Sequence, residues 1–506
     1  MKFNMNITKW VGKFNYEDAP AFELTPEMEL YSSVVTASLE NTFYEAKDER
    51  VERIRGLIKA NDPLFVAKLA VYTREKMHLR SVPLMLAVEL AKNNSGNALI
   101  GKVVDRVIQR ADEITELLSC YQLANKATGT KKLGKLSKQV QKGIASSFNK
   151  FDEYQFAKYN RTGVAIKLRD ALFLTHPKAK DEDQQLLFNK IAAEELATPY
   201  TWETELSALG QQLFATEEEK ALAFKHKWEE LIDSEKVGYM ALLRNLRNML
   251  DAEISLIHVK KAAAYLSNAE KVAKSKQLPF RFLAAYRELS ANKNGHVSVI
   301  LDALEKAVTL SAANIKGFNE NTKVLIACDV SGSMQKPVSA RSKILLYDIG
   351  LMLAMLMKSR CKNAITGMFG DKWKVVNVPT ASVLANVDAF YKREGEVGYA
   401  TNGYLVLKDL INSKRVVDKV LFFTDCQLWN NNSATTQLVQ LWSDYKRIAP
   451  TAKMYLFDLA GYGTTPLKTD SSDVFLIAGW SDKLFDVLAA IEDGQNALSE
   501  INAIEL

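Results

Sequence analysis

The chain has 506 residues, 47% of them hydrophobic and 25% charged, with a formal net charge of +6, which is the composition of a folded protein with more than one domain. Its N-terminus lacks the apolar core of a signal peptide, and no run of about 18 apolar residues is long enough to span a bilayer. We therefore expect a cytoplasmic protein without membrane contact, and the small net charge indicates no particular partner.

Helix-start signals dominate residues 1–318, which we predict to be an all-α domain. Thr25 and Asp62 are each followed by a proline, the usual pattern of an N-cap and the first helical residue. Connections are short, and one compact core could not cover so many helices, so we expect stacked antiparallel helix pairs. Helices are predicted at Glu27–Glu45, Arg50–Lys59, Leu64–Met77, Leu84–Lys92, Ala98–Arg110 and Ile114–Lys126.

A basic segment lies between Lys126 and Arg169, where eleven Lys or Arg residues stand against only Asp152 and Glu153. Spacings of three and four residues predict a shared helix face for several of its lysines. These are Lys131, Lys135, Lys138 and Lys142. Further basic residues of the segment are Lys132, Lys150, Lys158, Arg161 and Lys167.

Aromatic side chains accompany the basic segment. Tyr154, Phe156 and Tyr159 lie within it and His176 lies just beyond it. Concentrated positive charge beside stacking side chains is typical of an RNA-binding surface. The alternative is a solvated helix face, and a lone histidine such as His176 is more often structural than a ligand contact.

The last part of the chain, residues 319–506, is predicted to be a doubly wound α/β domain. Buried strands are expected at Val324–Cys328, Ala364–Phe369, Lys374–Val378, Lys419–Phe423, Lys453–Leu459 and Val474–Ile477. Helices are expected at Lys343–Lys358, Ala381–Tyr391, Asn402–Ile411, Ala434–Ile448 and Asp482–Glu492. Alternation of strands and helices favours a mainly parallel sheet covered on both faces.

Oxygen-bearing side chains follow three strand or loop segments of this domain. The sequence Asp329-Val330-Ser331-Gly332-Ser333 leaves the first strand, Thr401 lies in a glycine-flanked loop, and Asp425 ends a later strand. Hard oxygen ligands of this kind suit Mg²⁺. The set Asp329, Ser331, Ser333, Thr401 and Asp425 resembles the metal-ion-dependent adhesion site of von Willebrand factor A domains. The alternative is an α/β sheet whose strand-end carboxylates only cap helices or bind water.

Two stretches together resemble the Ro ribonucleoprotein family, the TROVE-domain proteins, in its bacterial form. One runs through Lys158-Tyr159-Asn160-Arg161 to Lys167-Leu168-Arg169-Asp170 and ends at His176-Pro177-Lys178, and the other is the Asp-x-Ser-x-Ser run with Thr424-Asp425. The resemblance implies a ring of HEAT-like helical repeats followed by the A domain. By position, Lys158, Arg169 and His176 match RNA contacts of the family, and Lys135, Lys138 and Lys142 match a basic helix before them.

The resemblance also implies the partners. Y RNA would lie on the basic outer surface, and single-stranded 3′ ends of misfolded noncoding RNA would enter the central hole, in work shared with the exoribonuclease polynucleotide phosphorylase. The loop Gly398-Tyr399-Ala400-Thr401 departs from the family's Gly-Gly-Thr. This difference affects the geometry of the loop and therefore the role of Thr401 as a direct metal ligand. A monomer is expected.

Two other classes of function remain open. A protein-binding scaffold would use the helices and the metal site to dock polypeptides, and would have no salt-sensitive affinity for RNA. A metal-dependent RNA hydrolase usually needs two metals held by several carboxylates, whereas the expected site is rich in hydroxyls. We found no phosphate-binding loop, catalytic triad or dinucleotide fingerprint, and the four widely spaced cysteines form no Cys-x-x-Cys pair. We therefore expect no enzyme.

Overall fold

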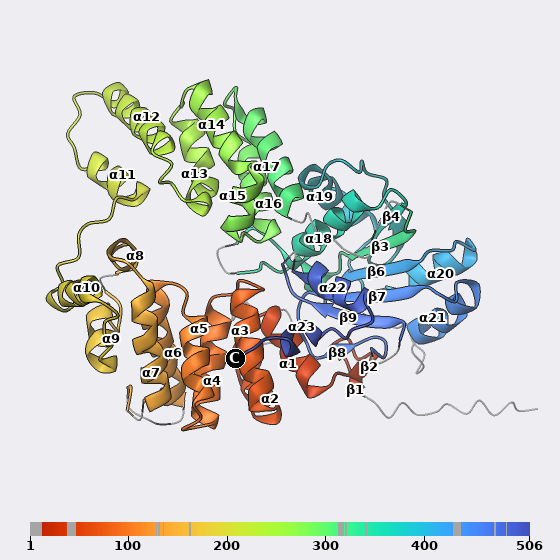
Figure 1. Ribbon diagram of the computed structural model, residues 1–506. Helices are drawn as coiled ribbons and strands as arrows, with labels where there is room; N and C mark the ends of the chain where they lie inside the picture. Colours follow the sequence, from red (N-terminus) through yellow and green to blue (C-terminus); the bar gives the residue numbers. More distant parts are fainter. Residues whose placement is uncertain are drawn as a thin grey trace, which may run out of the picture. The chain divides into compact units, whose positions relative to one another are not determined.

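The computed structural model describes residues 13–37, 47–127, 129, 132–134, 136–160, 163–311, 318, 321–339, 342–428, 437–469, 472–481 and 483–506. The chain forms two compact units. One, the helical unit, is Arg53–Gly238 with Glu500–Leu506, and the other, the sheet unit, is Met1–Glu52 with Tyr239–Ser499. The predicted fold class, a helical region followed by an α/β domain, is confirmed (Figure 1). The boundaries between the two units do not fall between residues 318 and 319. The domain boundary predicted there from the sequence stays a prediction.

The helical unit is a succession of short helices. After α2 (Lys47–Ala60) they are α3 (Pro63–Glu75), α4 (Ser81–Asn93), α5 (Leu99–Val107), α6 (Ala111–Ala127), α7 (Lys138–Ser147), η1 (Phe148–Lys150), α8 (Glu153–Tyr159), α9 (Leu168–Thr175), α10 (Glu182–Ala193), α11 (Trp202–Gly210) and α12 (Glu217–Asp233). The helices predicted between residues 50 and 126 correspond to α2–α6, with ends shifted by a few residues. From α3 to α10 each helix packs against neighbours a few places along the chain, as in stacked helical repeats.

Local sequence explains where these helices begin and how closely they approach. Asp62 caps α3, accepting a hydrogen bond from the backbone of Phe65 at 3.3 Å, with Pro63 in the first turn. Helix α7 comes close to α5 because Gly143 has no side chain: a Cβ there would lie 2.6 Å from the carbonyl oxygen of Gly101. Gly143 therefore fixes the position of the helix that carries Lys138 and Lys142.

The sheet unit contains α1 (Pro26–Val35) and five further helices that precede the large sheet. These are α13 (Tyr239–Asp251), α14 (Leu256–Leu266), α15 (Ala269–Ser275), α16 (Pro279–Ser290) and α17 (Val297–Ser311). Helix α16 packs against α18 (Leu346–Arg360) and α19 (Leu384–Tyr391) of the α/β part. The remaining helices are η2 (Gly332–Gln335), η3 (Glu394–Glu396), α20 (Tyr404–Asn412), α21 (Gln437–Ile448), α22 (Leu484–Glu492) and α23 (Ser499–Asn502).

The six-stranded sheet has the order β5-β4-β3-β6-β7-β9. Its strands are β3 (Val324–Asp329), β4 (Ala364–Phe369), β5 (Trp373–Val375), β6 (Lys419–Thr424), β7 (Lys453–Asp458) and β9 (Val474–Ala478). All neighbouring pairs are parallel except β4 and β5. Leu325, Phe422 and Leu456 face a core shared with α20 and α21, whereas the opposite face packs against α18 and α22. The sheet is therefore covered on both sides, as predicted.

The N-terminal segment corrects the expectation of an all-α region. Residues Lys13–Phe14 (β1) and Pro20–Glu23 (β2) form an antiparallel hairpin, and β2 pairs with β8 (Thr464–Thr465), as Figure 1 shows. Two further expectations need smaller corrections. The helix predicted at Glu27–Glu45 ends at Val35 as α1, with residues 38–46 outside the described part, and the strand predicted at Lys374–Val378 is β5. Among the described helices, none is long and apolar enough to cross a membrane.

Candidate metal centre and candidate nucleic-acid interface

The predicted metal ligands lie at the carboxyl ends of two neighbouring parallel strands. Asp329 is the last residue of β3 and Asp425 directly follows β6, which pairs with β3. Ser331 and Ser333 follow Asp329, and all four side chains are buried. Because parallel strands end at the same edge of a sheet, residues far apart in sequence meet there.

Hydrogen bonds hold the two carboxylates in place. Asp329 Oδ1 accepts the backbone N–H of Ser331 at 2.9 Å, and Asp329 Oδ2 accepts the hydroxyl of Thr424 at 2.6 Å. Asp425 Oδ1 accepts the backbone N–H of Gln427 at 3.0 Å. The hydroxyl oxygens of Ser331 and Ser333 lie 3.2 Å apart. The serines and aspartates thus converge on one position.

The loop that carries Thr401 is tied to the same place. The backbone N–H of Gly332 donates to the carbonyl oxygen of Tyr399 at 3.0 Å, and Thr401 is buried. Asp371 accepts the N–H of Ala400 at 3.0 Å, which fixes the loop from its other side. The structure therefore brings the Thr401 loop beside the Asp-x-Ser-x-Ser turn.

Burial of two carboxylates at one point is electrostatically costly. Burial raises the pKa of Asp329 above its ordinary range, and burial together with the charge of Asp329 raises the pKa of Asp425. Asp425 Oδ2 is buried, and among the described residues it has no hydrogen-bond partner. Within that part of the chain, no three His, Cys, Asp or Glu residues come together around a metal position. The donor set fits a hard divalent cation that relies on hydroxyls beside two carboxylates.

Two of the lysines that were predicted to share a helix face lie on a described helix. Lys138 and Lys142 are exposed on α7, but Lys132 lies in a turn before that helix with a φ of 45°. Lys131, Lys135 and Arg161 lie outside the described residues. The spacing of Lys131, Lys135, Lys138 and Lys142 predicted a helix along this stretch, but residues 132–134 form a turn and α7 begins at Lys138.

Cationic and aromatic side chains form a cluster around Tyr159. The Lys158 ammonium nitrogen lies 5.5 Å from the ring centroid of Tyr154 and 5.7 Å from that of Tyr159. The Arg110 guanidinium lies 4.3 Å from the Tyr159 centroid. Arg110 was not among the predicted site residues, since it stands outside the basic segment in sequence. These groups offer both charge and stacking surfaces.

Lys167, Arg169 and His176 lie around helix α9. Lys167 and Arg169 both approach Glu194, at 3.2 and 3.5 Å, on an exposed surface where ion pairs contribute little. The Arg169 guanidinium also lies 5.7 Å from the ring of Phe173, a side chain that is 52% exposed. His176 is exposed at the C-cap of α9 with a φ of 46°. All three are accessible to a ligand.

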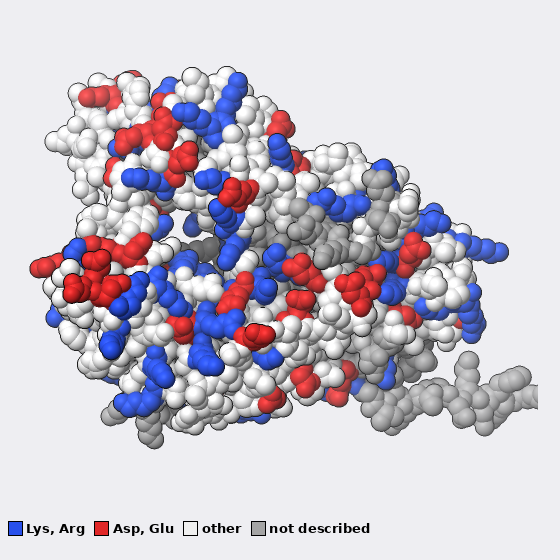
Figure 2. All heavy atoms as spheres, in the orientation of Figure 1, with Lys and Arg blue, Asp and Glu red and all other residues white. Residues whose placement is uncertain are grey.

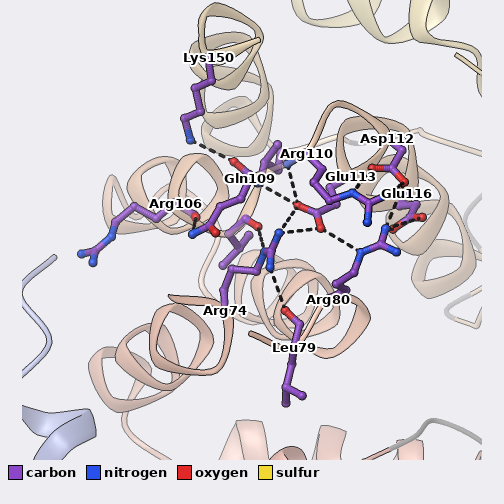
Figure 3. Close-up of polar contacts among 12 residues, drawn as sticks. Arg74, Leu79, Arg80, Arg106, Gln109, Arg110, Asp112, Glu113, Glu116 and Lys150 are labelled. Atoms are coloured by element: carbon purple, nitrogen blue, oxygen red, sulfur yellow. Dashed lines mark hydrogen bonds and ion pairs between the residues drawn. The ribbon is translucent and has the colours of Figure 1, made fainter. Parts of the chain in front are cut away.

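Figure 3 shows the arginine–carboxylate network that positions Arg110. Glu113 accepts two hydrogen bonds from Arg74, at 2.8 and 2.9 Å, and also the backbone N–H of Arg110 at 3.0 Å. Asp112 pairs with Arg110 at 2.9 Å and with Arg80 at 3.1 Å. Because Arg74 and Glu113 are buried, this network fixes the start of α6 and with it Arg110.

The charge of the helical unit is unevenly distributed on the face drawn in Figure 2. Lys and Arg side chains spread over the region where Figure 1 places α5–α9, and Asp and Glu side chains gather around α10. The first turn of α10 contains Glu182 and Asp183 after Asp181. The negatively charged backbone of a nucleic acid would therefore bind more favourably to the side of this unit that contains α7–α9.

Comparisons with known proteins identify a matching domain family. A model of the TROVE domain matches residues 30–199 and 192–300. A protein named telomerase protein component 1 from Rattus norvegicus is 40% identical over 94 residues, which are 19% of this chain and 3% of that protein. Its counterpart from Mus musculus is 41% identical over 91 residues, 18% of this chain and 3% of that protein. The chain thus matches only a small part of these relatives.

A solved structure shares the fold. The crystal structure of the Deinococcus radiodurans RO (RSR) protein matches 93% of this chain and 100% of its own, with a TM-score of 0.58 and 18% sequence identity.

Proposed function

The chain belongs to the TROVE domain family, whose proteins bind RNA and are not enzymes, and we propose that it holds Y RNA and single-stranded 3′ ends of misfolded noncoding RNA. The observation that carries this proposal is the cluster of Arg110, Tyr159, Lys158 and Tyr154, together with the exposed lysines of α7 in the same unit. Lysines neutralise phosphates without reading bases, and aromatic rings stack on unpaired bases. This combination suits a protein that accepts many RNAs with free single-stranded ends.

The biological role follows from that selectivity. We propose RNA quality control or processing, in which the protein presents bound RNA to an exoribonuclease such as polynucleotide phosphorylase, in the cytoplasm and as a monomer. The protein's own residues would bind and orient RNA, and the partner would cleave it. The resemblance of the Lys158–His176 stretch to the Ro family supports this role.

We propose that Mg²⁺ binds at Asp329, Ser331, Ser333, Thr401 and Asp425 in an A domain of the von Willebrand factor type. The buried Asp425 Oδ2, which has no hydrogen-bond partner within the geometric limits among the described residues, and the two converging carboxylates support it. When bound, the ion would supply an open coordination position for a carboxylate of a protein partner. The side chains of this chain hold the ion, and the bonds from Thr424 and Gln427 orient the two aspartates.

One experiment separates RNA binding from the alternative of a metal-dependent scaffold. The protein is purified from its own host after crosslinking, and the attached RNA is sequenced, with the Lys138→Ala/Lys142→Ala/Lys158→Ala variant as the control. We expect enrichment of structured noncoding RNAs, joined at positions near their 3′ ends, and loss of these RNAs in the variant. Recovery of proteins but no RNA with the wild type would favour the scaffold.

A further inference from the structure

Helix α10 ends at a glutamate whose carboxylate reaches two basic side chains at the start of the neighbouring helix α9. Glu194 Oε1 accepts a hydrogen bond from the Lys167 ammonium at 3.2 Å, and Glu194 Oε2 accepts one from the Arg169 guanidinium at 3.5 Å. All three side chains are about half exposed, so a ligand can reach them. A single carboxylate therefore occupies two of the cations that are predicted to contact RNA.

The backbone at Glu194 has a conformation that glutamate seldom adopts. As the C-cap of α10 it has a φ of 61° and a ψ of 36°, in the left-handed region where glycine or asparagine is usual. Its backbone N–H donates to the carbonyl oxygen of Ile191 at 3.2 Å, and the N–H of Glu195 donates to that of Lys190 at 2.9 Å. Glycine would make the same backbone contacts with less strain. The contacts that need a carboxylate are those to the two cations of α9.

A second ion pair attaches the end of α10 to α8, the helix that carries Tyr154 and Lys158. Lys190, in the last turn of α10, pairs with Glu153 in the first turn of α8 at 2.7 Å. The other carboxylate oxygen of Glu153 accepts the backbone N–H of Ala197 at 3.2 Å, so the chain is attached to α8 on both sides of Glu194. Helix α10 also packs against α9. The packing of these three helices thus fixes the position of the Glu194 carboxylate.

We propose that Glu194 is a built-in competitor of RNA, which holds Lys167 and Arg169 in the free protein and releases them when a phosphate group binds. This inference rests on the proposed RNA-binding function. Exposed ion pairs contribute little to stability, so a phosphate can displace the carboxylate. Until it does, the carboxylate cancels part of the positive charge of α9 and repels the phosphate. An RNA that contacts α9 alone therefore binds weakly, and stable binding requires further contacts, such as those of α7 and α8.

The test measures binding of a labelled RNA hairpin with a single-stranded 3′ tail to the full chain over a range of salt concentrations. For Glu194→Gln we expect about two- to fivefold tighter binding at low salt, the fold-change that corresponds to one exposed ion pair. The slope of log affinity against log salt should become steeper by up to about 1, because one more positive charge is available to a phosphate. Glu194→Asn, which suits the left-handed backbone, should give the same result, which excludes an effect of the helix end.

A comparison in a second background shows whether Glu194 acts through its two cations. In a chain that carries Lys167→Ala and Arg169→Ala, the further change Glu194→Gln should leave both the affinity and the slope unchanged. An increase as large as in the wild-type background would mean that Glu194 acts only through the net charge of the protein, and the competitor role would be wrong.

Glu217→Gln is the matched control. It removes the same charge from the same unit, where Glu217 pairs with Lys220 at 3.4 Å on the exposed surface of α12. Its affinity and slope should equal those of the wild type. If Glu194→Gln does not tighten binding, or tightens it no more than Glu217→Gln, the competitor role is wrong while RNA binding stands. If the wild type binds no RNA, the proposed function itself is wrong.

Discussion

Arg287 and Asp348 form a two-bond ion pair between α16 and the first turn of α18. The nitrogen–oxygen distances are 2.8 and 2.7 Å, and Asp348 is fully buried. Asp348 Oδ2 also accepts the backbone N–H of Leu345 at 2.9 Å. One carboxylate thus joins a helix that precedes the sheet to the largest helix that covers it, which fixes these parts of the sheet unit to each other.

Asp348→Ala should lower the free energy of unfolding of the sheet unit by about 3–5 kcal/mol, the usual cost of leaving one member of a buried ion pair unpaired. The variant leaves the Arg287 guanidinium without its partner and the Leu345 N–H without its acceptor. Urea unfolding followed by tryptophan fluorescence measures the change. As a control, Lys392→Ala removes an exposed charge near Asp388 and should not move the midpoint. Equal midpoints for both variants would show that the pair contributes nothing.

The ion pair also shows what sequence can and cannot reveal. The helix at Lys343–Lys358 is apparent from its apolar residues, and Asp348 is apparent as their interruption. The residue that explains this buried aspartate is Arg287. It cannot be recognised from the local sequence, because it lies 61 positions away. The same holds for the N-terminal strands, since Phe22 pairs with Thr465. Short strands whose partners lie far along the chain leave no local pattern.

The candidate sites were predictable to different degrees. Asp329 and Asp425 follow apolar strands, so their convergence at one sheet edge could be expected. Gln427 could not be connected with them, because a hydrogen bond from the distant N-terminal hairpin positions its side chain. Arg110 was missed for a similar reason: its place over Tyr159 depends on the packing of α6 beside α8.

Changing Lys138 and Lys142 together to Ala should weaken RNA binding for every sequence and flatten its salt dependence. Each lost phosphate contact lowers the slope of log affinity against log salt by about 1, so the slope should fall by about 2. Filter binding between low and moderate salt measures it. Lys260→Ala/Lys293→Ala removes two exposed lysines from another part of the chain and serves as the matched control. Identical slopes for the two double variants would show that the α7 lysines form a solvated helix face and do not contact RNA.

Tyr159→Ala should weaken binding of a single-stranded RNA tail by about 1–3 kcal/mol, the usual value of one stacked base. Tyr159→Phe keeps the ring and should retain most of the affinity. Arg110→Ala should have a smaller effect in the same direction, because it removes a cation from the ring that it covers. Fluorescence anisotropy with a labelled tail compares them. Full affinity in Tyr159→Ala would show that this ring does not contact the RNA.

The metal centre predicts a characteristic pH dependence. Burial raises the pKa of Asp329 and Asp425 in the folded state, so the folded protein holds more protons than the unfolded chain as the pH rises from about 4 toward neutrality. Without metal, these two groups therefore make the protein less stable with rising pH. Mg²⁺ replaces the protons, so its stabilising effect should be small at pH 5 and approach about 2.7 kcal/mol at pH 8 with Mg²⁺ at a hundred times Kd.

Thermal unfolding with Mg²⁺ or with a chelator, at both pH values, measures this effect. Asp329→Ala should abolish the response to Mg²⁺ while leaving RNA affinity nearly intact, because the basic residues lie in the helical unit. A Mg²⁺ effect that is equal at both pH values, or that persists in Asp329→Ala, would place the ion elsewhere. Loss of RNA affinity in the folded variant would show that the metal domain helps to form the RNA site.

Selective binding of RNA with a free single-stranded 3′ end is tested most directly by one comparison. The same RNA hairpin is prepared blunt and with a 3′ tail, and the two dissociation constants are measured in gel shifts at one salt concentration. We expect the tailed RNA to bind at least about tenfold more tightly, which is about 1.4 kcal/mol and within the range of one stacked base. Equal affinities for the blunt and tailed RNA would contradict the account.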